Sequence, residues 1–253
     1  MPFSTHNLRR RAGTSERAAS PLTWPGMAPE SSLRPRPAAP EIVRGTTRLD
    51  AVPLVPEIRI HQASEPISLW EDTERVTGVT GLDPPFWAFA WAGGRALARY
   101  VLDHPEAVRD MRVLDLASGS GLVAIAAARA GAAAVTACDI DPLAVAAIEV
   151  NARANGVTVG ALGADIMTGE GTAAPEADVV LVADAFYERE LAASVLRFLD
   201  RASAGGAAVL AGDFGRTYLP RDRLVAVAAY DVPGLRVLEG SDIKHTTIWT
   251  LRD

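Results

Sequence analysis

The sequence predicts a doubly wound α/β fold, in which a mostly parallel sheet of seven strands carries helices on both faces. From Met111 onward, short apolar runs typical of strands alternate with helical patterns. Continuous apolar strands separated by helices are typical of parallel sheets that are covered on both faces. A Gly-rich turn also follows one strand and opens a helix, as in the nucleotide-binding half of such a sheet.

The expected elements follow from apolar periodicity. Strands are predicted at 112–117, 134–139, 178–184 and 207–212, with weaker ones at 157–162, 235–239 and 246–251. Helices are predicted at 93–102, 121–130, 141–154, 188–201 and 220–228. A short β-like run at Ile58–Ile60 precedes them.

The composition indicates a soluble globular protein. The 253 residues are 49% hydrophobic and 22% charged, which is enough for one large domain with a sizeable core. The formal net charge of −6 argues against general nucleic-acid binding. The single cysteine, Cys138, excludes an internal disulfide and a Cys-based zinc site, so we expect no metal. No uncharged apolar run reaches the length of about 18 residues of a membrane span, and we expect a cytoplasmic protein.

The N-terminal segment differs from the rest of the chain. Residues 1–48 hold eight arginines and three acids, with frequent Pro, Ser and Ala and no apolar periodicity. We therefore expect residues 1–50 to be a disordered tail, and residues 51–253 to form a single domain, with order beginning near Pro53. An organellar transit peptide is the alternative for the tail, and Met27 is a candidate for the true start.

The Gly-rich turn is the most informative segment. The strand predicted at 112–117 precedes the turn, and Gly119 and Gly121 then allow a ligand to approach the backbone closely. The helix that follows offers free N–H groups to a carboxylate. Asp115 comes just before the turn, where a dinucleotide would place its pyrophosphate, and a carboxylate there repels phosphate. It suits a ligand with a cationic head, such as the amino group and sulfonium of S-adenosylmethionine.

Further acids follow the next two strands. Asp139 ends the second strand, where a carboxylate in nucleotide-binding α/β folds binds ribose hydroxyls. Asp141 precedes Pro142 and is expected to cap the next helix. Asp165 follows the weak third strand and is expected to accept a hydrogen bond from an adenine amino group, with Ile166 nearby; a solvated loop aspartate is the alternative.

The fourth strand ends in the run Asp184-Ala-Phe-Tyr187. Ligands of parallel sheets bind beyond the carboxyl ends of the strands, so Asp184 and Tyr187 are expected to face the reaction centre. A carboxylate beside an aromatic face suits a cationic amine.

Together these motifs resemble the seven-β-strand S-adenosylmethionine-dependent methyltransferases, which share a Rossmann-like fold. Within that class the chain is most similar to protein lysine methyltransferases with an Asp/Glu-x-x-Tyr/Phe motif after the fourth strand. The resemblance covers about residues 53–250 and rests on the segments 56–59, 85–94, 97–100, 113–116, 139–142, 184–187 and 212–216. Ala117 departs from the family, which has glycine there, and Phe214 stands where the family has proline.

The resemblance implies S-adenosylmethionine as cofactor and a protein lysine as acceptor, in the β subunit of electron transfer flavoprotein. Asp184 and Tyr187 would act on the lysine, and Trp87 is expected in the core. The implied cofactor-binding residues are Trp91, Gly93, Asp115, Ala117, Gly119, Gly121, Asp139, Ile140, Asp165 and Ile166.

Other functions stay open. A methyltransferase of this class could act on a ribosomal protein or a small amine instead. A NAD-dependent oxidoreductase is disfavoured by Asp115 and by Ala124, which stands where a dinucleotide pattern has its third glycine. A non-catalytic S-adenosylmethionine-binding protein is disfavoured by the intact pair Asp184 and Tyr187.

Overall fold

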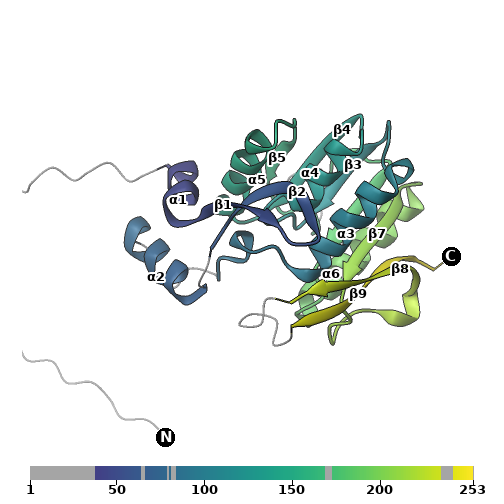
Figure 1. The fold of residues 1–253 in the computed structure, drawn as a ribbon. Coiled ribbons are helices and arrows are strands. Elements are labelled where there is room, and N and C mark those ends of the chain that lie inside the picture. The colour runs from purple at the N-terminus through teal and green to yellow at the C-terminus, as the bar shows by residue number, and fades with distance from the viewer. Residues whose placement is uncertain are drawn as a thin grey trace, which may run out of the picture. The chain divides into compact units, whose positions relative to one another are not determined.

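The main sheet of the computed structural model has seven strands in the spatial order β5-β4-β3-β6-β7-β9-β8 (Figure 1). They are β3 (Arg112–Leu116), β4 (Ala134–Asp139), β5 (Gly160–Gly163), β6 (Val179–Ala183), β7 (Ala208–Asp213), β8 (Leu224–Pro233) and β9 (Ile243–Leu251). The first five run parallel, and β9 is antiparallel to both β7 and β8. The structure describes residues 38–63, 66–78, 80, 84–168, 173–234 and 242–252. The predicted mostly parallel α/β sheet is confirmed.

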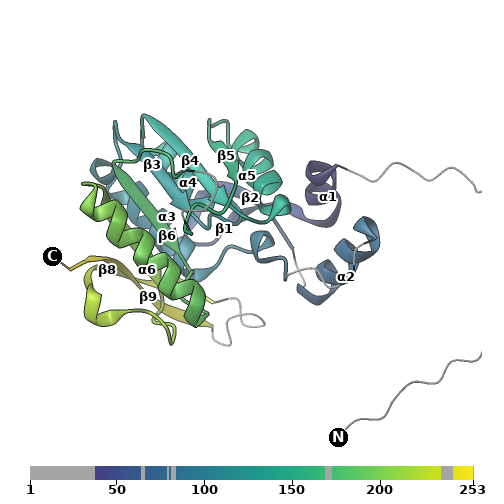
Figure 2. The ribbon, with the colours of Figure 1, turned by 180° about the vertical axis from the view of Figure 1, so that it is seen from behind.

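Helices cover both faces of this sheet. α3 (Ala92–Asp103), α4 (Leu122–Arg129) and α5 (Pro142–Ala154) pack on one face, in a core that includes Val113, Val135 and Leu181. α6 (Arg189–Ala204) packs on the other face against Leu114 and Val180, and Figure 2 shows it lying over the sheet. Neighbouring residues of the central strands β3 and β6 thus enter opposite cores, which explains why these two strands are mostly apolar.

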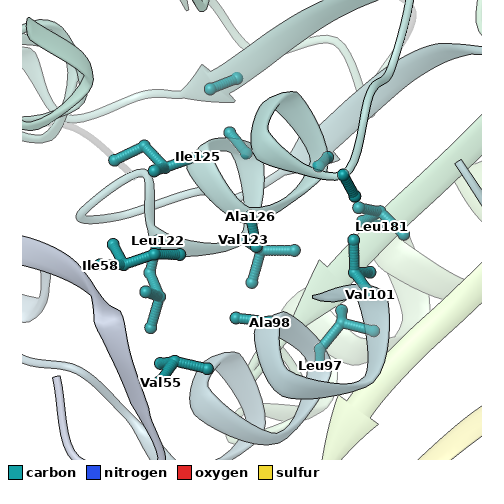
Figure 3. Close-up of a cluster of buried hydrophobic side chains, with 14 of the residues drawn as sticks. Val55, Ile58, Leu97, Ala98, Val101, Leu122, Val123, Ile125, Ala126 and Leu181 are labelled. Atoms are coloured by element: carbon teal, nitrogen blue, oxygen red, sulfur yellow. The ribbon is translucent and has the colours of Figure 1, made fainter. Parts of the chain in front are cut away.

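The core between α3, α4 and the N-terminal hairpin is shown in Figure 3. Val55 and Ile58 of β2 (Val55–Gln62) lie close to Leu122 of α4, and Ala98 of α3 lies on the same side of the cluster. All four side chains are at most 3% exposed. α3 therefore packs between the sheet and this hairpin, and its N-terminus lies at the carboxyl edge of the sheet.

The ordered region begins earlier than the sequence predicts. α1 (Ala39–Thr46) lies within the segment expected to be disordered, and β1 (Arg48–Val52), which pairs with β2, begins in it. Pro40 stands in the first turn of α1, where its missing N–H costs nothing, and Ile42 and Val43 are 6% and 0% exposed. Burial of these two apolar side chains stabilises a segment whose composition resembles a tail. The rest of the expected tail, residues 1–37 with Met27, lies outside the described residues.

The helix predicted at 220–228 is wrong. A short 3₁₀ turn, η3 (Arg221–Arg223), leads into β8, whose register with β9 runs from Leu224 opposite Leu251 to Pro233 opposite Ile243. The alanine-rich sequence favours a helix locally, but the antiparallel ladder with β9 satisfies the backbone and overrides that preference. The strand expected at 235–239 lies outside the described residues.

The remaining elements are α2 (Pro66–Thr77), η1 (Phe86–Ala88) and η2 (Pro105–Ala107). Within the described ranges, none of the helices combines the length and hydropathy that a membrane span requires.

Candidate active site

The Gly-rich turn between β3 and α4 is built from left-handed backbone. Ala117, Gly119 and Gly121 have φ values of 52°, 55° and 80°. A Cβ at Gly121 would lie 3.2 Å from the Cα of Ile148 in α5, so glycine allows this close packing. Ala117 adopts the same left-handed region despite its Cβ, at a cost of about 1–2 kcal/mol. The turn therefore requires a glycine-like conformation at 117 even though alanine occupies the position.

Asp115 lies beneath this turn. Its side chain is 1% exposed, and its Oδ2 accepts hydrogen bonds from Ser118 Oγ at 2.5 Å and from the backbone N–H of Ala124 at 3.0 Å. Ala124 belongs to the first turn of α4, so the carboxylate rests against the positive end of that helix. Burial raises the pKa of Asp115 to about 7, and the two hydrogen bonds oppose this rise. The anion expected at the turn is thus a buried group.

Asp139 connects β4 to the same turn. Its Oδ2 accepts from the N–H of Gly119 at 2.8 Å and its Oδ1 from the N–H of Asp141 at 3.0 Å, and burial raises its pKa. Asp141 in turn accepts from Leu143 N at 2.8 Å and caps α5, as the sequence predicts. Ile140, between the two acids, has a side chain that is 69% exposed. An apolar surface therefore stands beside the Asp139 carboxylate.

A surface pocket adjoins Ile140. Trp87, expected in the core, is 1% exposed, and its buried Nε1 has no hydrogen-bond partner in the part of the chain that the structure describes. The lining residues are Trp70, Thr73, Pro85, Trp87, Ile140, Asp141, Pro142 and Leu143.

The resemblance assigns both Asp165 and Ile166 to the cofactor site, but in the loop after β5 the two side chains have different surroundings. Oδ1 of Asp165 accepts from the N–H groups of Met167 at 2.9 Å and Thr168 at 3.3 Å, so the carboxylate closes its own loop at the surface. Ile166 is 3% exposed and packs in the core with Cys138. Its side chain does not line an open surface, in contrast to that of Ile140.

Asp184, directly after β6, sits at the N-terminus of α3. Its own φ is 58°, and its Oδ1 and Oδ2 accept from the N–H groups of Gly93 at 3.1 Å and Gly94 at 2.7 Å. The carboxylate therefore supplies the cap that the N-cap residue, Trp91, does not supply with its side chain. A Cβ at Gly93 would overlap the carbonyl oxygen of Gly212 and lie 2.7 Å from Asp184 Oδ2. In this structure Gly93 contacts the Asp184 carboxylate and β7.

Arg216, in the loop after β7, contacts two acids at this edge of the sheet. Its Nη1 lies 2.5 Å from Asp184 Oδ1 and 2.9 Å from Asp213 Oδ2. Asp213 was not predicted, although its signal was present: it is an acid at the carboxyl end of β7, next to β6 in the sheet.

Aromatic rings lie near Tyr187, which follows Asp184 by three residues. The Tyr187 side chain is 45% exposed, and its ring centroid lies 5.6 Å from that of Phe86. Phe86 is 5.9 Å from the ring of Trp91, whose Nε1 donates to the Phe86 carbonyl at 2.9 Å. The sequence did not single out Phe86, because an aromatic residue before a core tryptophan carries no distinguishing pattern.

The site residues thus form two groups at the carboxyl edge of the sheet. The turn group holds Asp115, Ala117, Gly119, Gly121, Asp139 and Ile140, and the Asp184 group holds Gly93, Asp184, Asp213, Arg216 and Tyr187. They meet at Gly94, where a Cβ would lie 3.8 Å from Asp184 Oδ2 and 3.9 Å from Val123 Cγ2 in α4. The described ranges contain no group of three or more His, Cys, Asp or Glu residues that could hold a metal ion.

Comparison with known proteins gives the context for these groups. The family model of ribosomal protein L11 methyltransferase (PrmA) matches residues 96–212. The rat electron transfer flavoprotein beta subunit lysine methyltransferase is 33% identical over 202 residues, 78% of this chain and 77% of that protein. The human protein of the same name is 35% identical over 202 residues, with 78% and 75% covered. A crystal structure of ribosomal protein L11 methylase from Lactobacillus delbrueckii subsp. bulgaricus is 17% identical, with a TM-score of 0.45 and 65% and 81% covered.

The sheet order, the turn and the relatives together define a methyltransferase of the seven-stranded class. More narrowly, the chain belongs to the family of the electron transfer flavoprotein beta subunit lysine methyltransferases. The resemblance read from the sequence motifs is confirmed.

Proposed function

We propose that this methyltransferase transfers the methyl group of S-adenosylmethionine to lysine side chains of the β subunit of electron transfer flavoprotein. One observation carries the proposal: the Asp184 carboxylate is fixed on the N-terminus of α3, and the exposed ring of Tyr187 stands three residues further along. The relatives named for this activity, at 33% and 35% identity, support the choice of substrate.

The turn group suits S-adenosylmethionine. Asp139 retains free lone pairs for ribose hydroxyls beside the exposed Ile140, against which an adenine ring can pack. When ionised, above its pKa of about 7, the buried Asp115 gives the turn a negative field that favours a cationic head group. We propose that Trp91 and Gly119 also line the cofactor site and that Asp165 lies at its outer end. When bound, S-adenosylmethionine supplies a methyl group activated by the positive charge on sulfur.

The residues around Asp184 suit a lysine. A lysine amine has an ordinary pKa of about 10.4, so it arrives as a cation and must lose its proton to water before it attacks. Asp184 is a nearby anion whose field attracts that cation, and the Tyr187 ring offers a π-face to the ammonium and apolar surface to its stem. The chain's contribution to the transfer is therefore orientation and exclusion of water, and a dedicated base is not required.

The direct test uses the full chain with purified electron transfer flavoprotein and methyl-labelled S-adenosylmethionine. We expect label on lysines of the β subunit and none with Asp184→Ala, while that variant still binds S-adenosylmethionine in calorimetry. Asp200→Ala, which removes an exposed carboxylate paired with Arg223, is the matched control and should keep full activity. Label on another protein instead would reject the substrate.

A second candidate substrate is ribosomal protein L11, because the matching family model carries that name over residues 96–212. Parallel reactions with L11 and with the flavoprotein separate the two. A NAD-dependent activity is tested by cofactor titration, in which we expect saturable binding of S-adenosylmethionine and none of NAD. The proposed cytoplasmic location is checked by cell fractionation.

A further inference from the structure

Three charged side chains form a largely buried cluster at the carboxyl ends of β6 and β7. The Arg216 guanidinium bridges Asp184 Oδ1 and Asp213 Oδ2 through one nitrogen, at 2.5 and 2.9 Å. The side chains of Arg216, Asp184 and Asp213 are 13%, 10% and 0% exposed. A surface ion pair contributes little, whereas the loss of one partner from a cluster as buried as this leaves a charge without compensation.

The loop after β7 is built to hold Arg216 in this place. Asp213 Oδ1 accepts from the backbone N–H groups of Gly215 at 2.6 Å and Arg216 at 2.8 Å, so one carboxylate fixes both the backbone and the guanidinium. Gly215 has a φ of 92°, a conformation that favours glycine. The Phe214 ring lies 4.2 Å from the Arg216 guanidinium, and the amine of Lys244 lies 4.2 Å from the same ring. Asp213, Phe214 and Gly215 therefore all support the position of Arg216.

The hydrogen bonds of Asp184 show what this arrangement does. Asp184 Oδ2 accepts from Gly94 N, and Oδ1 accepts from both Gly93 N and Arg216 Nη1. The N-terminus of α3 and the Arg216 guanidinium thus donate hydrogen bonds to the Asp184 carboxylate from two different elements. Displacing the carboxylate from this position breaks at least one of these three hydrogen bonds.

We propose that Arg216 is a positioning residue for methyl transfer, which fixes the Asp184 carboxylate, in its ionised form, between α3 and the loop after β7. The inference rests on the proposed function, since it deepens the role of Asp184. Asp213 supports Arg216, and we assign neither residue a contact with the reacting atoms.

The electrostatics agree with this geometry. Burial raises the pKa of Asp184, and the charge and hydrogen bond of Arg216 oppose that rise. The groups that face Asp184 are Arg216, the anion of Asp213, and the N–H groups of Gly93 and Gly94. Without the guanidinium, Asp184 faces an anion and loses its main source of positive charge. Its ionisation therefore moves to higher pH, and the acid limb of the rate profile moves with it.

A different role for the same contact makes the opposite prediction. If Arg216 only occupied Asp184 until a substrate amine displaced it, its removal would free the carboxylate. KM for the protein substrate would then fall, with kcat unchanged or higher.

The test compares Arg216→Gln, Arg216→Lys and the control Arg223→Gln, which removes an exposed partner of Asp200. Methylation of electron transfer flavoprotein is measured from pH 6 to 10. For Arg216→Gln we expect kcat at neutral pH to fall at least tenfold, KM to change less than threefold, and the acid limb to move up by at least one pH unit. Arg216→Lys keeps the charge, so we expect its acid limb to lie at the wild-type pH. If the Gln variant does not fold, the pH profile of the Lys variant is the measurement that decides.

A readout without substrate separates this inference from the proposed function. In the full chain labelled with ¹³C-aspartate, the Asp184 carboxyl signal is assigned by its loss in Asp184→Asn and titrated in wild type and in Arg216→Gln, or in Arg216→Lys where the Gln variant does not fold. A higher midpoint without the guanidinium, or a wild-type midpoint in the Lys variant, supports the inference even if the flavoprotein is not the substrate. An unchanged midpoint in the Gln variant, a shifted midpoint in the Lys variant, or a lower KM overturns it.

Discussion

The guanidinium of Arg216 and the carboxylate of Asp184 form a buried ion pair, with Nη1 2.5 Å from Oδ1. The pair joins residues 32 positions apart in the chain, at the ends of two neighbouring strands. It shows that the acid expected to receive a substrate amine is already engaged by the protein's own cation and by a helix N-terminus.

Gly93→Ala should destabilise the protein and abolish activity. Its Cβ would overlap the Gly212 carbonyl oxygen and press on Asp184 Oδ2 at 2.7 Å, so α3 must move away from β7. Overpacking of this kind costs about 1–3 kcal/mol. Denaturant unfolding gives the stability, and labelled methyl transfer gives the activity.

Gly94→Ala is the matched control for Gly93→Ala. Its Cβ would meet Asp184 Oδ2 at an ordinary 3.8 Å, within the same first turn of α3. We expect its stability to equal or exceed that of wild type, because alanine favours the helix. Equal effects of the two substitutions would refute the close approach of α3 to β7.

Asp115→Asn should stabilise the fold at alkaline pH and weaken S-adenosylmethionine binding. The pKa of Asp115 is about 7 when folded, against an ordinary 3.8, so the native state favours the protonated acid. The stability penalty of the charged form therefore grows as pH rises from about 4 to about 7 and is complete above that. Both donors converge on one oxygen, which an asparagine carbonyl can replace.

At pH 8 we expect Asp115→Asn to exceed wild type in free energy of unfolding by on the order of 4 kcal/mol, since burial raises the pKa from 3.8 to about 7, and to match it near pH 4. Calorimetric binding of S-adenosylmethionine should be at least tenfold weaker. Asp178→Asn is the control of opposite sign, because its pairing with Arg112 lowers the Asp178 pKa to about 2. It should lose stability at pH 8, where Asp115→Asn gains it; a gain in both would point to net charge.

Ala117→Gly should raise stability by about 0.5–1 kcal/mol, since glycine removes the left-handed penalty and returns only part of it as unfolded-chain entropy. The φ of 52° at this position is the reason. Thermal unfolding measures the change. Gly121→Ala, at a φ of 80° and 3.2 Å from the Ile148 Cα, should instead destabilise. A loss of stability in Ala117→Gly would show that the turn at 117 is not strained.

Tyr187→Ala should raise KM for the protein substrate about tenfold, because it removes an aromatic face worth about 1–2 kcal/mol to a cation. Tyr187→Phe keeps the ring that packs near Phe86 and should change KM less than threefold. Steady-state methylation kinetics of the two variants decide the point. Similar KM values for alanine and phenylalanine would remove the ring from substrate binding.

Local patterns predicted most of the fold. A few consecutive residues suffice to identify the apolar strands β3, β4, β6 and β7. The same is true of the turn with Gly119 and Gly121, and each of these elements is confirmed. The acids Asp115, Asp139 and Asp184 were predicted as site residues for the same reason, since each stands at or beside the carboxyl end of a strand. Position on a strand end predicts the edge of the sheet on which a side chain lies, because parallel strands end together.

Long-range packing explains what the sequence missed. α1 and β8 form because distant partners bury Ile42 and Val43 or pair with β9, and neither partner is visible in a local window. The same holds for Arg216, whose partner Asp184 lies 32 positions away in the chain.

The sequence by itself determined the doubly wound class, the turn and the acids at its edge, because these depend on residues close together in the chain. The tertiary structure alone decided which of those acids are open and which are already engaged. Asp115 is buried under α4, and Asp184 is held by Gly93, Gly94 and Arg216. The cause is physical: burial and ion pairing depend on the packing of whole elements, and that packing sets the charge of a carboxyl group.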